Sequence, residues 1–103
     1  MDLPPAVASH LQEIRDLCRV AGVARLWIFG SAARGEWRAG ESDLDFLVEF
    51  SSDRSRAEQF AVLYDGLERL LQVHFDLVSE HGVRNPFLRA ELDDTRVLLH
   101  AAA

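Results

Sequence analysis

The sequence contains no lysine, because all eleven of its basic residues are arginine. Mechanisms that need a lysine amine are therefore excluded, including a P-loop, a Schiff base and a lysyl-nucleotide intermediate. The single cysteine, Cys18, leaves no material for a disulfide framework or a thiolate zinc site. Because Cys18 lies within a helical apolar pattern, we expect it to pack in the core.

Long apolar runs and excess positive charge are also missing. No apolar segment approaches the roughly 18 residues that span a bilayer, and residues 1–5 lack the pattern of a signal peptide. We therefore expect a cytoplasmic protein with no membrane contact. The net charge is −6. Since nucleic-acid binders gain most of their affinity from Lys and Arg that neutralise phosphates, nucleic acid is not an expected partner.

What the chain does have is enough apolar material for one core. Its 103 residues are 49% hydrophobic, which predicts a single domain over residues 1–103 and no second one. The periodicity predicts these elements: a helix over 5–21, a strand over 23–29, a loop over 32–42, a strand over 43–50, a helix after the capping box of Ser55 and Glu58, a strand over 73–79, and a helix from Pro86 with Asn85 as its N-cap. Residues 96–100 fit either the end of that helix or a short strand. This order predicts a layered α/β or α+β domain.

Acidic residues stand out in two of the expected strands. Asp43 and Asp45 are two residues apart, so their side chains leave one face of a strand, roughly 7 Å apart along the chain. Asp76 lies in the middle of the next strand, between Phe75 and Leu77. If the two strands are neighbours, Asp76 comes within about 5 Å of one of the other two.

Carboxylates so placed repel one another. Two unit charges 4 Å apart cost about 4 kcal/mol at an effective dielectric of 20, so an arginine, a metal ion or a proton must compensate. Oxygen ligands favour Mg²⁺ or Mn²⁺ over zinc. The alternative for Asp43 and Asp45 is a solvated strand end at a turn, but this does not explain Asp76 in a separate apolar strand.

A second candidate feature is Gly30-Ser31, directly after the first strand. A glycine lets backbone N–H groups approach an anion, and a helical turn starting at Ser31 would add its free N–H groups and its dipole. Such a pair is also a common turn and helix cap. Arg34 and Arg38 follow in the loop, where an arginine could neutralise phosphate charge. Trp37 is expected to anchor the loop, and no histidine shows ligand spacing.

Three blocks of the sequence together resemble the minimal nucleotidyltransferases of the DNA polymerase beta superfamily, which are often partnered with HEPN proteins in toxin–antitoxin pairs. The blocks are Phe29 to Gly35, Ser42 to Phe50 and His74 to Ser79. The likeness extends over most of the chain. It implies a mixed β-sheet flanked by helices, the polymerase-beta-like nucleotidyltransferase core.

The resemblance also implies roles for individual residues. Gly30 and Ser31 would bind the triphosphate of the nucleotide, and Asp43 and Asp45 would bind two metal ions. Asp76 would complete the site as a metal ligand and as a possible base for the acceptor hydroxyl. The implied chemistry is in-line attack on the α-phosphorus with loss of pyrophosphate, without a covalent enzyme intermediate.

The chain departs from the family pattern at two places. The spacer between Ser31 and Asp43 is one residue longer than usual, with Gly40 as the extra residue, which concerns the geometry of the loop. Position 32 is alanine where some relatives have arginine, so one phosphate contact is missing.

Three functions remain open from the sequence. The first is an adenylyltransferase that acts as an antitoxin by modifying a tyrosine of a HEPN-type toxin, with ATP as donor, in a hetero-oligomer. The second is a binding module that neutralises its partner by contact alone. The third is a transferase toxin that acts on a tRNA end, and the acidic charge balance counts against it. The first is favoured, because a pure binder does not need mutually repelling carboxylates.

Overall fold

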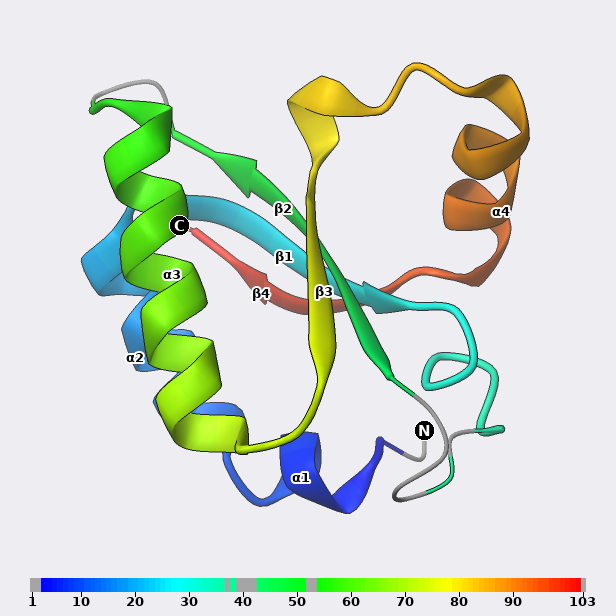
Figure 1. Cartoon of the computed structure of the whole chain (residues 1–103), viewed down its shortest axis with the longest axis horizontal. Coiled ribbons are helices and arrows are strands. Elements are labelled where there is room, and N and C mark those ends of the chain that lie inside the picture. The colour runs from blue at the N-terminus through cyan, green and yellow to red at the C-terminus, as the bar shows by residue number, and fades with distance from the viewer. Residues whose placement is uncertain (1–2, 37, 39–42, 52–53, 103) are drawn as a thin grey trace.

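The computed structural model describes residues 3–36, 38, 43–51 and 54–102, so Trp37 and Gly40 lie outside the described residues. The elements shown in Figure 1 are α1 (Pro5–Ala8), α2 (Leu11–Ala21), β1 (Val23–Phe29), β2 (Leu44–Phe50), α3 (Arg56–Leu71), β3 (Phe75–Ser79), the 3-10 turn η1 (Glu80–Gly82), α4 (Pro86–Thr95) and β4 (Val97–Ala101). Within the described residues, no helix is long and apolar enough to cross a membrane.

The strands form one mixed sheet in the order β3-β2-β1-β4. β1 runs antiparallel to both β2 and β4, whereas β2 and β3 run parallel. The mixed sheet with flanking helices that the resemblance implies is therefore confirmed. Residues 97–101 form an edge strand and not the end of a helix, which decides between the two alternatives for this segment.

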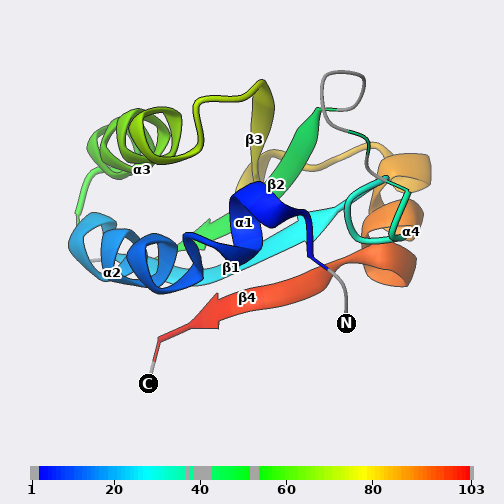
Figure 2. The same cartoon turned by 90° about the horizontal axis from the view of Figure 1, so that it is seen from below.

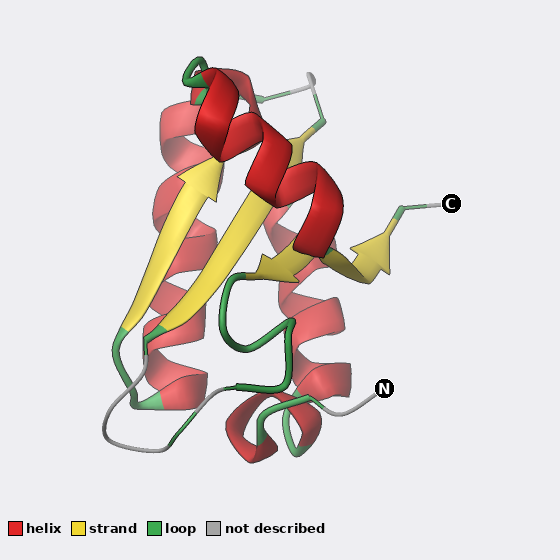
Figure 3. Cartoon of the chain, turned by 90° about the vertical axis from the view of Figure 1, so that its right-hand side faces the viewer, coloured by secondary structure: helices red, strands yellow, loops and turns green. Residues whose placement is uncertain are grey.

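Helices cover the two faces of the sheet unequally. α2 and α3 lie side by side on one face, whereas α4 packs alone on the other (Figures 2 and 3). Residues of β2 alternate between these faces as predicted: Leu44, Phe46 and Val48 belong to the large core beneath α2 and α3, and Leu47 belongs to a small cluster with Leu92 of α4. Each buried Leu or Phe contributes about 1.5–3 kcal/mol to folding.

Cys18 is fully buried in the large core, as expected. Burial raises the pKa of its thiol to about 12, against a small opposing effect of Arg19. Because the thiolate is the reactive form, Cys18 is chemically inert and acts as an apolar packing residue.

Two local predictions are wrong. The single helix expected over 5–21 is interrupted at Ser9 and His10, where the Ser9 hydroxyl donates to the carbonyl of Pro5 and the His10 backbone leaves the helical conformation. Serine hydroxyls that bond their own backbone compete with helix propagation in this way. The capping box of Ser55 and Glu58 is also absent, because Ser55 is the N-cap residue but its side chain makes no capping bond.

The start of α4 agrees with the sequence. The side chain of Asn85 accepts hydrogen bonds from the N–H groups of Phe87 at 2.9 Å and Leu88 at 3.4 Å. With Pro86 in the first helical position, these bonds satisfy donors that a helix end leaves unpaired. The cap thereby fixes where α4 begins. Among the described residues, α4 is the only helix on this face of the sheet.

Candidate active site

The predicted acidic residues come from two adjacent strands. Asp45 of β2 pairs with Asp76 of β3 in parallel register, and on its other side Asp45 pairs with Phe29 at the end of β1. Paired residues on neighbouring strands project from the same face of the sheet. The carbonyl of His74 accepts a hydrogen bond from the N–H of Leu44 at 3.2 Å, which ties the starts of β2 and β3 together. The strand pairing that the sequence analysis required is confirmed.

The pKa of the Asp45 carboxyl depends on its burial and on the charges around it. Burial is the largest cause that raises the pKa of Asp45 from 3.8 to about 6. The negative charges of Asp76 and then of Asp43 add to this rise. Glu91 of α4 adds a smaller contribution, and the positive charge of Arg34 opposes it. The three aspartates therefore form one electrostatic cluster, in which Asp43 and Asp76 are exposed and Asp45 is half-buried.

Gly30 lies directly against this cluster. Its backbone has a φ of +72°, a left-handed conformation that residues with a side chain rarely adopt. A Cβ atom on Gly30 would lie 2.6 Å from Oδ2 of Asp45, far inside contact distance. A glycine is therefore needed both for the backbone conformation and for the approach of the carboxylate. Only the first of these reasons can be anticipated from the sequence.

The segment after Gly30 forms the expected helical turn. The N–H groups of Ala33 and Arg34 both donate to the carbonyl of Gly30, at 3.1 and 3.2 Å, and that of Glu36 donates to the carbonyl of Ser31 at 2.8 Å. Within the described residues, the N–H and hydroxyl groups of Ser31 have no hydrogen-bond partner. Ser31 thus presents donors beside Asp45, where an anion could accept them.

Arg34 lies near the aspartates but is engaged with other acids. Its Nε donates to Oε1 of Glu36 at 2.5 Å, and its Nη1 lies 3.5 Å from Oε1 of Glu91. The second contact joins the turn after β1 to α4. Arg34 must therefore exchange at least one of these partners before it can bind a phosphate. The sequence analysis missed Glu91, because nothing in its helical surroundings distinguishes it from a solvated residue.

The oxygen atoms of this cluster are of the chemical type that a magnesium ion prefers as ligands. Asp43, Asp45 and Asp76 offer only carboxylate oxygens, which Mg²⁺ and Mn²⁺ prefer. In the described residues, no three His, Cys, Asp or Glu side chains converge closely enough to enclose a metal ion. Repulsion between like charges opposes such convergence unless a cation compensates it. The ligand type fits, and binding would draw the exposed carboxylates inward.

Comparisons with known proteins agree with this fold. Residues 9–99 match the nucleotidyltransferase domain family. The chain is 30% identical over 93 residues to "Putative protein adenylyltransferase MJ0128" of Methanocaldococcus jannaschii, with 90% of each chain covered.

Solved structures extend the likeness to three dimensions. A "putative minimal nucleotidyltransferase" superposes with a TM-score of 0.76 at 39% identity, covering 94% of this chain and 95% of that one. The MNT antitoxin fold seen in complex with a tri-AMPylated Shewanella oneidensis HEPN toxin is also similar, with a TM-score of 0.64 at 18% identity and coverage of 92% and 72%. At that identity the second likeness concerns the fold alone.

The mixed sheet and flanking helices are those of a polymerase-beta-like nucleotidyltransferase core. The chain belongs to the nucleotidyltransferase domain family, and the class of reaction that it catalyses is nucleotidyl transfer.

Proposed function

We propose that this nucleotidyltransferase moves AMP from ATP to a tyrosine hydroxyl of a HEPN-type partner protein, uses Mg²⁺ held by Asp43, Asp45 and Asp76, and acts as an antitoxin. The observation that carries the proposal is the direct pairing of Asp45 with Asp76 beside the turn at Gly30. Acidic side chains next to unpaired donors support the proposal, because a nucleotide with its metal ions needs both.

The aspartates would hold two magnesium ions. When bound, such ions neutralise the triphosphate and stabilise the charge that develops on the leaving pyrophosphate. The raised pKa of Asp45 supports this role, because a cluster whose own charges disfavour ionisation gains most from a cation. A purely structural ion pair would instead supply its own positive partner. Asp45 has no such partner among the described residues.

The remaining residues would position the nucleotide and move a proton. The Ser31 hydroxyl and N–H would donate to the triphosphate, and Gly30 would let the phosphates approach the backbone. Arg34 would add positive charge after leaving Glu36. Asp76 would accept the proton of the acceptor hydroxyl while the oxygen of that hydroxyl forms a bond to the α-phosphorus. The bond between the α-phosphorus and the bridging oxygen then breaks, and pyrophosphate leaves with that oxygen.

The acceptor and partner are inferred from relatives. MJ0128 carries the description of a protein adenylyltransferase, and the toxin bound to the MNT antitoxin is AMPylated. A hydroxyl on a partner protein therefore fits better than a nucleic-acid end, and the net charge of −6 also disfavours nucleic acid. Co-expression with a HEPN protein would give a hetero-oligomer.

The test is nucleotide transfer to a co-purified HEPN partner with ATP and Mg²⁺, followed by mass spectrometry of the intact partner. We expect a gain of one or more AMP units on tyrosine. Asp45→Asn and Asp76→Asn should each reduce the rate by at least about a hundredfold, since each removes a metal ligand. Asp65→Asn, an exposed aspartate of α3, is the matched control and should retain full activity.

The same experiment separates the competing functions. If the partner gains no mass but is still neutralised by the Asp45→Asn protein in cells, the chain acts by binding alone. If AMP is transferred to tRNA instead of protein, the proposed transfer chemistry is correct and the antitoxin role is wrong. Normal transfer by both aspartate variants would contradict the proposed metal site.

A further inference from the structure

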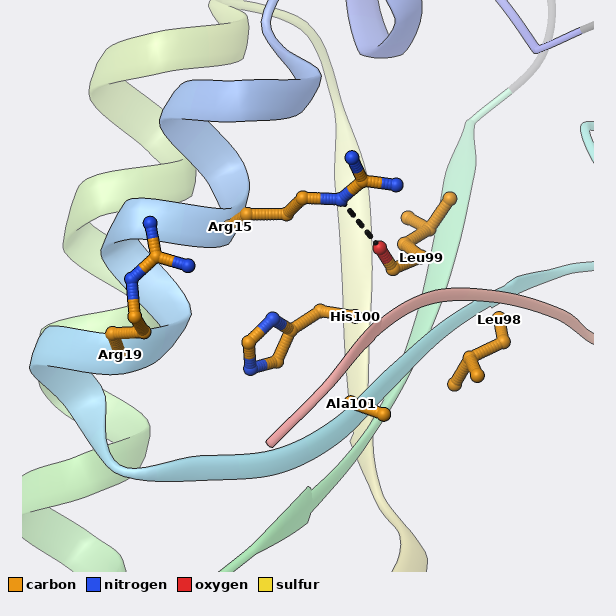
Figure 4. A pocket seen from close by; sticks show the side chains of 6 residues that line it. All are labelled: Arg15, Arg19, Leu98, Leu99, His100 and Ala101. Atoms are coloured by element: carbon orange, nitrogen blue, oxygen red, sulfur yellow. Dashed lines mark hydrogen bonds between the residues drawn. The ribbon is translucent and has the colours of Figure 1, made fainter. Parts of the chain in front are cut away.

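A polar hollow lies on the α2 face of the sheet, away from the aspartates. It has a volume of about 370 Å³ and is lined by Arg15, Arg19, Leu98, Leu99, His100 and Ala101 (Figure 4). β4 is the edge strand opposite β3, and His100 pairs with Leu26 in the middle of β1, whereas Asp45 pairs with Phe29 at its end. The hollow is therefore separate from the candidate active site.

A β-bulge builds one wall of this hollow. His100 pairs with Leu26 and Leu98 pairs with Trp27, so Leu99 is an extra residue between the two pairs. Bulges bend an edge strand and re-aim its side chains. Here Leu99 and His100 are both buried on the side of α2, while Leu98 is 49% exposed. Regular alternation would have placed His100 and Leu98 on the same face of the sheet.

The His100 ring has an unsatisfied polar atom. The side chain is only 8% exposed, and its Nε2 has no hydrogen-bond partner among the described residues. The backbone of Val23 also interacts with the ring. Buried polar atoms are nearly always partnered, so the enclosed Nε2 makes His100 an unusual residue to find in the lining of a hollow.

Two arginines of α2 face the same hollow. Arg15 and Arg19 lie one helical turn apart, and Figure 4 shows both side chains extending from α2 and the His100 ring between α2 and β4. The Nε of Arg15 donates to the carbonyl of Leu99 at 3.0 Å, which leaves its two terminal nitrogens without an acceptor in the described residues. Arg19 contacts Asp16 on the outer side of the helix.

The charge of the residues that line this hollow is opposite in sign to the net charge of the whole chain. The chain carries −6 in total, yet no acidic residue lines this hollow. Burial, with smaller contributions from Arg19 and Arg15, lowers the pKa of His100, while the interaction with the Val23 backbone opposes the shift. An anion in the hollow would compensate the charge of Arg15 and would compete with Asp16 for Arg19.

We propose that this hollow is a second ligand site that binds the phosphate group of a small molecule through Arg15 and Arg19, beside the His100 ring. A phosphate has enough oxygens to accept from both arginines at once, and its negative charge suits guanidinium groups. The volume lies at the lower end of the range of small-molecule pockets. Inorganic phosphate, pyrophosphate and the phosphate of AMP share this chemistry. The proposal does not depend on the acceptor or the partner inferred above.

NMR titration of the full chain tests this proposal. The His100 ring resonances are followed while phosphate, pyrophosphate or AMP is added at constant ionic strength, with EDTA present so that no metal-dependent binding occurs at the aspartates. We expect saturable shifts, with a Kd of about 1 mM or tighter for at least one of the three. Equal affinity for phosphate and AMP would identify the free anion as sufficient, whereas tighter binding of AMP would identify a nucleotide site.

Charge variants provide the controls. Arg15→Gln and Arg19→Gln should each weaken binding by about tenfold, because each removes one charged donor. Arg19 is exposed, so its replacement leaves the fold intact even if loss of the Arg15 bond to Leu99 disturbs β4. Arg69→Gln, an equal change of charge at the end of α3, should bind as the wild type does. If no anion shifts His100, or if Arg19→Gln binds as tightly as Arg69→Gln, the second site does not exist.

Discussion

At the scale of single residues, Gly30 and Asp45 act as one unit. The carboxylate of Asp45 occupies the space where a side chain at position 30 would begin. This contact fixes the position of the carboxylate relative to the turn that carries Ser31. The proposed metal ligand and the turn that we propose binds phosphate are thus close together because position 30 has no side chain.

The first prediction concerns Gly30→Ala. The new methyl group must displace Asp45, and a misplacement of about 1 Å at a reacting centre can lower a rate by about a hundredfold. We therefore expect transfer activity to fall by at least about tenfold. Gly35→Ala is the matched control, because Gly35 also has a positive φ, of +75°, but a Cβ atom added to it would meet nothing within 4 Å. If both variants lose activity equally, backbone strain and not the contact with Asp45 is responsible.

The second prediction concerns the stability of the metal-free protein. The pKa of Asp45 is about 6 in the folded state against 3.8 ordinarily, so the folded state binds protons more tightly than the unfolded chain. The resulting stabilisation is complete below about pH 4 and is lost as the pH rises through 6. At pH 7 the ionised carboxylate is therefore unfavourable.

Asp45→Asn should remove this unfavourable term. In EDTA at pH 7, we expect the variant to gain about 1 kcal/mol in unfolding free energy, a value reduced to allow for solvent screening at a half-buried site. The gain should shrink toward pH 4. Urea unfolding at several pH values measures it. A variant that is less stable than the wild type at pH 7 would contradict the electrostatic account of the aspartate cluster.

At the scale of elements, α4 depends on a few polar contacts for its position. Oε1 of Glu80 accepts from Nη1 of Arg89 at 2.6 Å, and Oε2 lies 3.7 Å from Nη1 of Arg96. The guanidinium of Arg96 in turn lies 4.7 Å from the centre of the Trp27 ring. α4 also carries Glu91, whose Oε1 lies 3.5 Å from Nη1 of Arg34 beside the candidate active site.

The third prediction concerns Glu80→Gln. The change removes the charge shared by Arg89 and Arg96, and we expect a loss of about 1 kcal/mol in unfolding free energy. Amide hydrogen exchange should become faster in α4 but not in α2. Glu68→Gln, an exposed position of α3, is the control. Unchanged exchange in α4 would mean that the small apolar cluster around Leu92 holds the helix without help from Glu80.

At the scale of the whole molecule, charge is distributed unevenly. The chain has a net charge of −6, and Asp43, Asp45 and Asp76 lie together at the end of the sheet where β1 ends and β2 and β3 begin. Binding of a cation there lowers the repulsion of the folded state and has little counterpart in the unfolded chain, where these residues lie far apart.

The fourth prediction is that Mg²⁺ stabilises the entire fold. At a concentration about ten times its Kd, the gain is about 1.4 kcal/mol, which raises the Tm of a domain of this size by roughly 5–10 °C. Thermal unfolding with Mg²⁺ and with EDTA measures the difference. The double variant Asp43→Asn, Asp45→Asn should show no magnesium-dependent rise, whereas Asp65→Asn should behave as the wild type. Equal stabilisation of all three proteins would indicate general screening by the divalent salt.

Much of the architecture could be predicted from local patterns. The alternation in residues 43–50 identified β2 and its two faces, and Asn85 with Pro86 identified the start of α4. Such patterns are reliable because the period of a strand and the cap of a helix depend on residues close together in the chain. The break at Ser9 and the missing bond of Ser55 were not predictable, because local alternatives of similar energy compete there.

The sequence by itself determined the kind of chemistry: carboxylates at two strand positions, a glycine and a serine after a strand, and no lysine or second cysteine to supply another mechanism. Only the tertiary structure decided that Asp76 stands opposite Asp45, that Glu91 lies close to both Arg34 and Asp45, and that a bulge turns His100 toward Arg15. The physical reason is that ligand types are fixed by residue identity, whereas register, helix docking and bulges depend on packing between segments that are distant in sequence.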